Sequence, residues 1–562
     1  MRIGKTLATA VAVILSTVLL GGCAGEKKEG GTAGAPAAGQ APGAAGPATP
    51  HAPVHGDAIV GGSIGDVSGF LSAVTSDSAS HDAASYVFNG LVRYDKDLKL
   101  EGELAESWDI SPDGKTITFH LRKGVAWHDN VPFTSDDVMF TYKRMIDPKT
   151  PTAYGEDFRQ VKRASAPDPH TFVVTYEKPF APALASWGMY ILPKHLLEMY
   201  PDISKSPLNS KRPVGTGPFR FVEWKTGERT VFEANPGYFE GRPYLSRVVT
   251  RVIPDQATLF LELKSGGIDT MGLTPLQYTR QTETAEFRKA FNKYKYLSFG
   301  YTYLGFRLSH PLFSDKRVRQ ALAHAINKKE IIDGVLFGLG QEATGPYKPG
   351  TWAYNPNVRR YPYDPARASA LLAEAGWKAG ADGTLSKGGR KFAFTVLTNA
   401  GNDSRAKTAA IIQQNLSAVG IRMDIRTLEW SAFINDFVNK RKFDALILGW
   451  TITQDPDQFD IWSSTKTGPR ELNHVGFRNA DVDRLLEEGR RTFDLEKRKA
   501  AYFTIQEILA EEQPYVFLYY PDALPVVAKR IRGIEPAPAG ISYNFIRWYV
   551  PKAEQKYTAF QP

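Results

Sequence analysis

The chain has 562 residues, of which 42% are hydrophobic, 12% aromatic and 23% charged, and its formal net charge is +9. Its basic residues are interspersed with acidic ones and form no basic run in the body, which argues against a nucleic-acid-binding protein. The single cysteine, Cys23, excludes an internal disulfide and a zinc site built from several cysteines.

The first residues have the pattern of an export signal. Arg2 and Lys5 precede an uncharged run from 7 to 20, which is shorter than the roughly 20 apolar residues that a membrane span needs. The run ends in Leu-Gly-Gly before Cys23, and this resembles the lipobox of bacterial lipoproteins. We therefore predict a signal peptide over 1–22 and a lipid on the Cys23 thiol; the alternative is an incidental or buried thiol.

Residues 23–56 are rich in Ala, Gly and Pro and show no apolar periodicity. Such a segment buries too little apolar surface to offset its conformational entropy, so we predict a disordered tether. Its use would be to hold a folded body away from a membrane surface. Roughly 500 residues follow, which is enough for two or three lobes.

The body is expected to begin with a strand, a loop and a helix between 57 and 98. Residues 116–122 alternate apolar and polar side chains, which predicts a half-buried strand of a hairpin. A helix should start at Thr134 or Ser135, because either residue can cap it, and 171–176 is predicted as another strand.

The segment 213–218, Pro-Val-Gly-Thr-Gly-Pro, interrupts this pattern and leads into a predicted strand over 219–222. We interpret it as a crossing between lobes, with an ordinary glycine-rich turn as the alternative. It is not a phosphate-binding loop, because no Lys-Ser/Thr pair follows it.

The second half of the chain alternates helices with strands. Asp315 and Asn327 are predicted to cap two successive helices, and Pro365 to open a third at its first position. The remaining elements are predicted by their spacing: a helix over 409–419 and strands over 392–397, 421–427, 445–449 and 541–550. This alternation is typical of an α/β fold.

Four stretches in this body resemble bacterial extracellular solute-binding proteins of the dipeptide, oligopeptide and nickel group (family 5). In chain order they include Leu104-Ala105-Glu106-Ser107-Trp108 with Trp127-His128-Asp129, Gly215-Thr216-Gly217-Pro218-Phe219 with Asn235-Pro236-Gly237-Tyr238-Phe239, Arg317-Val318-Arg319-Gln320-Ala321-Leu322, and Tyr363-Asp364-Pro365 with Gly376-Trp377. Any one stretch is moderately specific, whereas the ordered set is strong. The resemblance implies a two-lobed periplasmic binding protein of type II with an additional third lobe.

The resemblance also implies how the lobes are divided and what they do. Lobe I would comprise 57–98, 213–305 and 520–562, the additional lobe 99–212, and the ligand-gripping lobe II 306–519. The lobes would close on a small ligand by a hinge motion and deliver it to the permease subunits of an ABC importer. The implied protein is a monomer in the periplasm or on the cell surface, held to the membrane by its lipid, and needs no cofactor.

A peptide is the ligand that the resemblance implies first. The same fold binding a nickel chelate, haem or an oligosaccharide is an alternative, as is a peptide sensor that feeds no importer. A hydrolase is the rival from another class. The chain has no His-Glu-x-x-His, and its one Gly-x-Ser-x-Gly match, Gly61-Gly62-Ser63-Ile64-Gly65, is only a short motif that would need a strand, a sharp turn and a helix around it to form a nucleophile elbow. The ten histidines show no metal-ligand spacing, so we predict neither an enzyme nor a metal site.

Two ligand walls are implied by the same resemblance. One is Ser76-Asp77-Ser78, where relatives offer backbone groups to a peptide. The other is Gly449-Trp450-Thr451, at the end of a strand that in peptide-binding relatives pairs with the backbone of the peptide. Side-chain pockets lined by aromatic residues and water would tune selectivity.

The chain departs from the family at the site for the ligand's ammonium group. Peptide-binding relatives carry an aspartate three residues after the tryptophan, whereas this chain has Thr453 after Trp450. Asp455 or Asp457 could supply the missing charge, since a cation in a closed cleft needs an anionic partner. The alternative is that both are turn or cap residues around Pro456.

Four aromatic residues are further candidates for the cleft wall. Tyr301 and Tyr303 precede the third family stretch, Trp352 follows Pro349-Gly350-Thr351, and Trp462 lies further along lobe II. For each of them, packing in a hydrophobic core is the alternative. His128 lies within a family stretch of the additional lobe, and we predict a structural role for it.

Overall fold

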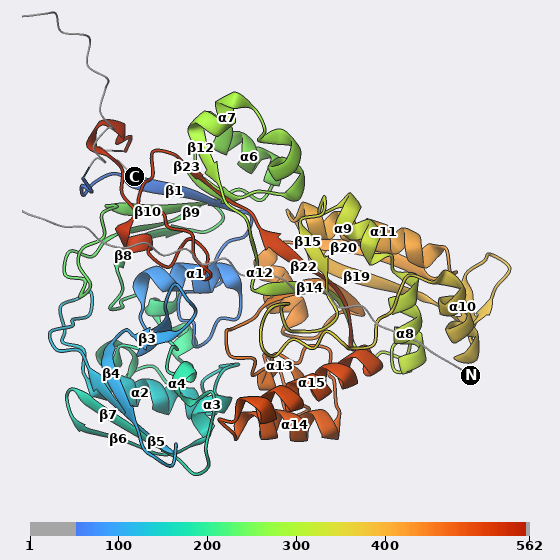
Figure 1. Ribbon diagram of the computed structural model, residues 1–562, viewed down its shortest axis with the longest axis horizontal. Helices are drawn as coiled ribbons and strands as arrows, with labels where there is room; N and C mark the ends of the chain where they lie inside the picture. Colours follow the sequence, from blue (N-terminus) through green and yellow to red (C-terminus); the bar gives the residue numbers. More distant parts are fainter. Residues whose placement is uncertain (1–51, 558–562) are drawn as a thin grey trace, which may run out of the picture. The chain divides into compact units, whose positions relative to one another are not determined.

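The computed structural model describes residues 52–557, so the predicted signal peptide, Cys23 and most of the tether lie outside the described residues. Two seven-stranded sheets and one four-stranded sheet organise the described chain, with helices packed against them (Figure 1). Between residues 52 and 557, no helix has the length and apolar character of a membrane span.

The first seven-stranded sheet has the order β12-β23-β11-β1-β10-β9-β8. Its strands are β1 (Ala58–Ser63), β8 (Phe219–Lys225), β9 (Arg229–Ala234), β10 (Arg247–Val252), β11 (Thr270–Gly272), β12 (Phe291–Lys293) and β23 (Pro525–Ala528). Successive residues of β1 alternate between its faces: Ile59 packs towards α1 (Ser78–Val87), and Val60 towards α6 (Gln256–Ser265) and α7 (Ala285–Ala290).

The second seven-stranded sheet contains the order β13-β22-β14-β21-β19-β20, with β15 paired to β22. Its strands are β13 (Tyr296–Leu297), β14 (Gly300–Phe306), β15 (Gly340–Glu342), β19 (Ala393–Asn399), β20 (Arg422–Leu428), β21 (Ala445–Thr451) and β22 (Tyr515–Ala523). Each face carries its own core. Ile447 packs with α8 (Lys316–Ala325), α9 (Lys328–Gly334), α10 (Pro365–Glu374) and α11 (Asp403–Ser417), whereas Leu448 packs with α13 (Phe459–Trp462), α14 (Ala480–Arg490) and α15 (Leu495–Glu512).

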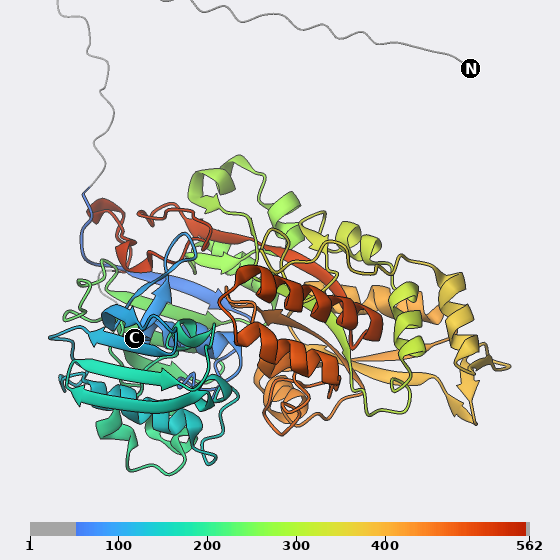
Figure 2. The same ribbon diagram turned by 60° about the horizontal axis from the view of Figure 1, so that its bottom comes forward.

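A four-stranded antiparallel sheet, drawn in blue to teal in Figure 2, has the order β4-β5-β7-β6. It comprises β4 (Ala105–Ile110), β5 (Thr116–Leu121), β6 (Val161–Asp168) and β7 (Thr171–Tyr176), accompanied by α2 (Ser135–Ile146), α3 (Glu156–Arg159), α4 (Ala183–Ser186) and α5 (Lys194–Leu197). Its core is continuous with the α1 face of the first sheet: Phe119 and Val174 belong to the same buried cluster as Phe219. These two parts therefore pack as one body.

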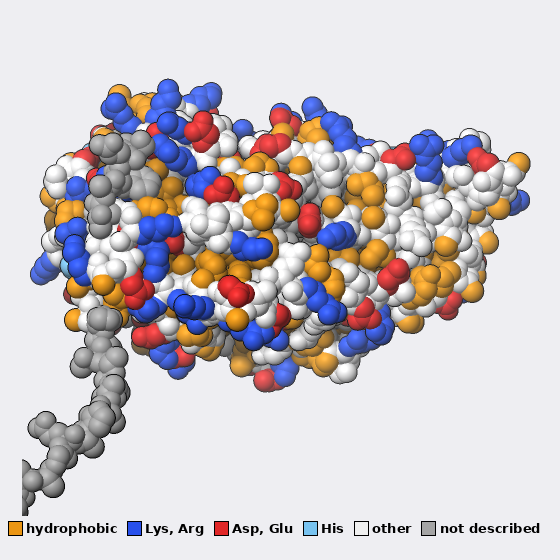
Figure 3. Space-filling model, turned by 90° about the horizontal axis from the view of Figure 1, so that it is seen from above, with side chains coloured by type: hydrophobic (Ala, Val, Ile, Leu, Met, Phe, Trp, Pro, Cys, Tyr) orange, Lys and Arg blue, Asp and Glu red, His pale blue; other side chains and the backbone are white. Residues whose placement is uncertain are grey.

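Several short elements complete the described chain. They are β2 (Val92–Tyr94), β3 (Leu100–Gly102), β16 (Lys378–Ala379), β17 (Leu385–Lys387), β18 (Arg390–Lys391), α12 (Trp430–Ala432), π-helical turns at Gln277–Gln281 and Phe433–Val438, and 3₁₀ turns at Ile203–Lys205, Pro207–Asn209, Phe545–Arg547 and Lys552–Glu554. Figure 3 shows basic and acidic side chains interspersed over the visible face, as the sequence predicts.

The predicted α/β alternation is confirmed, and so are the predicted caps. Thr134 caps α2, the Asp315 side chain accepts a bond from the Arg317 N–H, and the Asn327 side chain accepts one from the Glu330 N–H. The 213–218 segment packs tightly on the end of α1: an added Cβ on Gly215 would lie 1.8 Å from the Val87 carbonyl oxygen, so only glycine fits there.

Two predicted elements differ from the structure, one in its start and one in kind. The helix predicted over 409–419 begins earlier, at Asp403, because Asn402 caps it with a bond from the Arg405 N–H. The strand predicted over 541–550 is absent from the described structure, which has a 3₁₀ turn at Phe545–Arg547 instead. Local bonds of Asn544, to the Gly533 carbonyl and from the Trp548 indole, compete with strand pairing there.

Candidate functional site

A cavity of about 2270 Å³ is lined by residues of both seven-stranded sheets and of α1. The predicted wall residues Ser76, Asp77 and Ser78 line it at the start of α1, and Gly449, Trp450 and Thr451 line it at the end of β21. The two walls therefore face one space, although some 370 residues of sequence separate them.

Asp77 is committed to the local structure of its wall. Its carboxylate accepts a 2.9 Å bond from the Ser80 N–H, as the N-cap of α1, and a bond from the Ser68 hydroxyl. Its side chain is also reached from the other sheet, since the indole Nε1 of Trp430 lies 3.5 Å from its Oδ1. Asp77 thus links α1 to α12, and residues of both helices line the cavity.

The opposite wall presents an open strand edge. β14 pairs with β21 along its whole length, but β19 pairs with β21 only at Ala445 and Leu446, and the Thr398 hydroxyl bonds the Ile447 carbonyl. From Leu448 to Thr451 the β19 side of the strand has no strand partner within residues 52–557, and this stretch lines the cavity. An open edge offers N–H and C=O groups to an extended ligand.

Trp450 is held in place beside this edge. Its ring stacks on His474, with centroids 5.4 Å apart, and its Nε1 donates to the Tyr515 hydroxyl at 3.3 Å. Burial lowers the pKa of His474 to about 3, so the imidazole is neutral at physiological pH. The neutral ring forms a flat apolar support for the indole.

Asp455 and Asp457 line the cavity, but both are neutralised by arginines of the same lobe. Arg498 donates to both carboxylate oxygens of Asp455, at 2.8 and 3.0 Å, and Arg490 Nε lies 2.9 Å from Asp457. Asp455 also accepts the Asp457 N–H, and Asp457 accepts the Phe459 N–H. This geometry matches the alternative interpretation, in which both are turn and cap residues.

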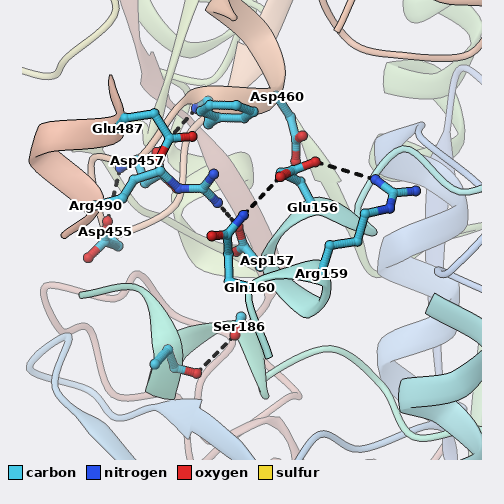
Figure 4. A network of polar contacts seen from close by, with 12 residues as sticks. Glu156, Asp157, Arg159, Gln160, Ser186, Asp455, Asp457, Asp460, Glu487 and Arg490 are labelled. Carbon is cyan, nitrogen blue, oxygen red and sulfur yellow. Dashed lines mark hydrogen bonds and ion pairs between the residues drawn. The ribbon is translucent and has the colours of Figure 1, made fainter. Parts of the chain in front are cut away.

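Arg490 joins two parts of the molecule (Figure 4). Its guanidinium contacts Asp457 on one side and Asp157 of α3 on the other, and its backbone oxygen accepts a 2.7 Å bond from the Ala181 N–H. Next to it, Lys466 contacts Glu156 at 2.9 Å and Asp460 at 3.2 Å. The network therefore links the four-stranded part to the α13–α14 face of the second sheet. Within this network the carboxylates outnumber the cations.

The four candidate aromatics divide between the cavity and the core. Tyr301 lines the cavity, whereas Tyr303, Trp352 and Trp462 are not among its lining residues. Tyr303 stacks on Tyr515 with centroids 3.9 Å apart, Trp352 packs on Tyr502, and the fully buried Trp462 donates to Gln458. For these three the structure matches the core alternative.

Sequence reasoning missed Arg405, which lies in the first turn of α11 and lines the cavity. A cation near a helix N-terminus opposes the macrodipole. Arg405 donates to Asn399 Oδ1 at 2.8 Å, and no carboxylate in the described chain pairs with it. An added Cβ on Gly449 would lie 3.0 Å from its Nη2, so the guanidinium lies directly against the open edge of β21. Asn402 is a typical helix-capping residue, and recognising it as the cap would have placed Arg405 in the first turn of this helix.

His128 has the structural environment that the sequence predicts. Its Nδ1 receives the Gly215 N–H and its Nε2 lies 3.0 Å from the Gly217 carbonyl, which ties the 213–218 segment to the turn after β5. Burial lowers its pKa to about 4. Across residues 52–557, no group of three or more His, Cys, Asp or Glu side chains is arranged to hold a metal ion.

A family model for the bacterial extracellular solute-binding proteins, family 5 (middle), matches residues 99–470. The oligopeptide-binding protein AppA of Bacillus subtilis is 35% identical over 511 residues, covering 89% of this chain and 93% of the relative. Heme-binding protein A of Haemophilus influenzae is 31% identical over 84% of this chain and 88% of the relative.

Solved structures show the same similarity. AppA from Bacillus subtilis in complex with a nonapeptide superposes with a TM-score of 0.85 at 33% identity, covering 89% of this chain and 100% of that one. NikZ from Campylobacter jejuni in complex with Ni(L-His) gives a TM-score of 0.80 at 30% identity, covering 88% and 99% of the two chains. The predicted type II periplasmic-binding fold is confirmed by these matches.

Proposed function

Because the chain belongs to the bacterial extracellular solute-binding proteins of family 5, we propose that it captures peptides outside the cytoplasm and delivers them to an ABC importer. The family is extracellular, so the protein works in the periplasm or at the cell surface. Its members bind solutes, and binding and release suffice for this role without a covalent step.

The open edge of β21 is the observation that carries the peptide proposal. An extended peptide can pair its backbone with Leu448–Thr451, which gives affinity that does not depend on the peptide's sequence. Arg405 lies against that edge without a carboxylate partner in the described chain, so it is placed to bind a ligand carboxylate. A free peptide supplies both an extended backbone and a carboxylate.

Closure of two lobes is the proposed mechanism of capture. We retain the lobe ranges predicted from the sequence, with the crossings where β13 leads to β14 and where β22 runs into β23. Contacts across the cavity support a closed state: Trp430 reaches Asp77, and the Asp403 N–H donates to Gln256 at 2.9 Å. A ligand that bridges both walls shifts the population towards this state by its higher affinity for it.

The peptide proposal predicts which ligands stabilise the protein. We expect peptides of two to nine residues to raise the melting temperature after bound ligand has been removed by unfolding and refolding. A ligand at 100 times its Kd stabilises by about 2.7 kcal/mol. The same thermal scan with nickel–histidine, haem and cello-oligosaccharides provides the comparison, since one relative is named a heme-binding protein and another was solved in complex with Ni(L-His). A shift with one of these and none with peptides would contradict the proposal.

We also propose that a lipid on Cys23 holds the protein at the membrane, on the basis of the Leu-Gly-Gly-Cys sequence. A single acyl chain anchors only weakly, so several chains would be needed for stable attachment. We expect the wild-type protein in the membrane fraction of cells and Cys23→Ser in the soluble or secreted fraction. Equal membrane recovery of the two proteins would reject the anchor.

A further inference from the structure

The acidic side chains that line the cavity differ in whether they are already neutralised. Asp66, Asp77 and Asp95 accept hydrogen bonds from neighbouring N–H groups. Apart from Asp82, each remaining carboxylate of the lining binds a cationic side chain or a side-chain amide. The cations are those of Arg93, Lys466, Arg490 and Arg498, and the amide is that of Asn89. Asp82 has no hydrogen-bond or ion-pair partner for its carboxylate within residues 52–557.

Asp82 lies in the middle of α1, on the wall opposite β21. Its side chain is exposed, but the solvent that reaches it fills the cavity between the two walls. Burial by those walls, together with the negative charge of Asp77, raises the pKa of Asp82 to about 6. The carboxylate thus lies in the cavity beside a second acid, and neither of the two has an ion-pair partner within the described chain.

A role in the fold does not account for this side chain. The N-cap of α1 is Asp77, and the Ser85 hydroxyl bonds the backbone oxygen of Asp82 rather than its carboxylate. The dipole of the helix favours an acid in the first turn, and Asp82 lies beyond that turn. A carboxylate that lines a cavity beside a like charge, without a partner of its own, would be stabilised by a bound cation.

We propose that Asp82 binds the cationic group of the ligand, in the role that Asp455 and Asp457 cannot fill because arginines already neutralise them. This inference rests on the proposed peptide function. It places the cation site on the α1 wall and the carboxylate site, Arg405, on the β21 wall, so that one ligand bridges both. The cation can come from the α-ammonium group of a peptide or from a lysine side chain.

The test compares wild type with Asp82→Asn on mixtures of random tetrapeptides. The first mixture lacks lysine and arginine, and half of its peptides have a free N-terminus while the other half are N-acetylated. The second mixture is fully N-acetylated, so that lysine side chains are the only ammonium groups it offers. Bound peptides are released and counted by mass spectrometry. Glu286→Gln, which removes an exposed carboxylate of α7 outside the cavity, is the matched control.

We expect wild type and Glu286→Gln to retain free peptides at least about 10-fold better than acetylated ones, because a hydrogen bond between charged groups contributes at least that much to binding. Asp82→Asn should lose this preference. If instead Asp82→Asn loses only the selection for lysine in the acetylated mixture, the cation comes from a side chain and the role of Asp82 still holds. The same preference in Asp82→Asn as in wild type would overturn the inference and leave the peptide function standing. Retention of no peptide by wild type would overturn both.

Discussion

Replacing Arg490 with alanine is expected to lower the free energy of unfolding by about 3–5 kcal/mol, because removal of one partner leaves buried carboxylates without a counter-ion. The Arg490 side chain is only 1% exposed, and that of Asp457 is 9% exposed. Phe180 and Phe459 lie against the guanidinium, with its carbon 4.9 and 4.4 Å from the ring centroids. Water therefore cannot replace the lost charge without opening the network. Urea unfolding followed by circular dichroism measures the effect.

The neighbouring arginine provides a matched control for this experiment. Arg491 pairs with Glu487 at 2.7 Å, but both side chains are more than one third exposed. Surface pairs of this kind contribute about 0–1 kcal/mol, so Arg491→Ala should change stability little. In an Asp157→Asn background the loss of stability caused by Arg490→Ala should be smaller, because one of the carboxylates that would be left unpaired has already been removed. Equal losses for Arg490→Ala and Arg491→Ala would contradict the buried network.

Replacing Arg405 with glutamine is expected to weaken binding of a peptide acid by about 10- to 150-fold, which corresponds to the roughly 1.5–3 kcal/mol of a hydrogen bond to a charged group. The guanidinium lies against Gly449 and has no carboxylate partner in the part of the chain that the structure describes, so a ligand carboxylate would be its counter-ion. Burial lowers the pKa of Arg405. Isothermal titration calorimetry on a peptide found in the thermal scan measures the loss.

A C-terminal amide of the same peptide separates this role from a general effect. Wild type should prefer the acid to the amide, and Arg405→Gln should bind the two alike. Arg422→Gln on β20, which removes an exposed cation paired with Asp424 outside the cavity, should behave as wild type. An acid preference that survives in Arg405→Gln would show that the carboxylate is bound elsewhere.

Local chemistry made much of the fold predictable from the sequence. The strand predicted over 171–176 is β7 (Thr171–Tyr176), because its alternation matches one buried face, and Asp315 caps α8 as its position before the apolar repeat predicts. The segment 541–550 is equally rich in strand-forming residues, but Asn544 engages distant and local partners that no pattern reveals. Local sequence patterns do not predict secondary structure where a side chain binds a partner that only the folded chain brings close.

The candidate site was predictable only in part for the same reason. The resemblance located both walls, and the structure brings them to one cavity. It could not show that Arg498, 43 residues after Asp455, would neutralise this aspartate, since the pairing depends on how α15 packs. Arg405 and Asp82 stand out only once the pairing of every charge in the cavity is known.

The open edge of β21 also bears on solubility. An unpaired strand edge on a protein surface is a template for other chains and promotes aggregation, so soluble proteins usually cover or charge such edges. Here the edge lines a cavity, with α1 on the opposite wall and the loop after β21 beside it, which leaves less room for a second sheet than an open surface would. Recessing the edge thus lets the empty protein keep its pairing groups free while avoiding self-association through them.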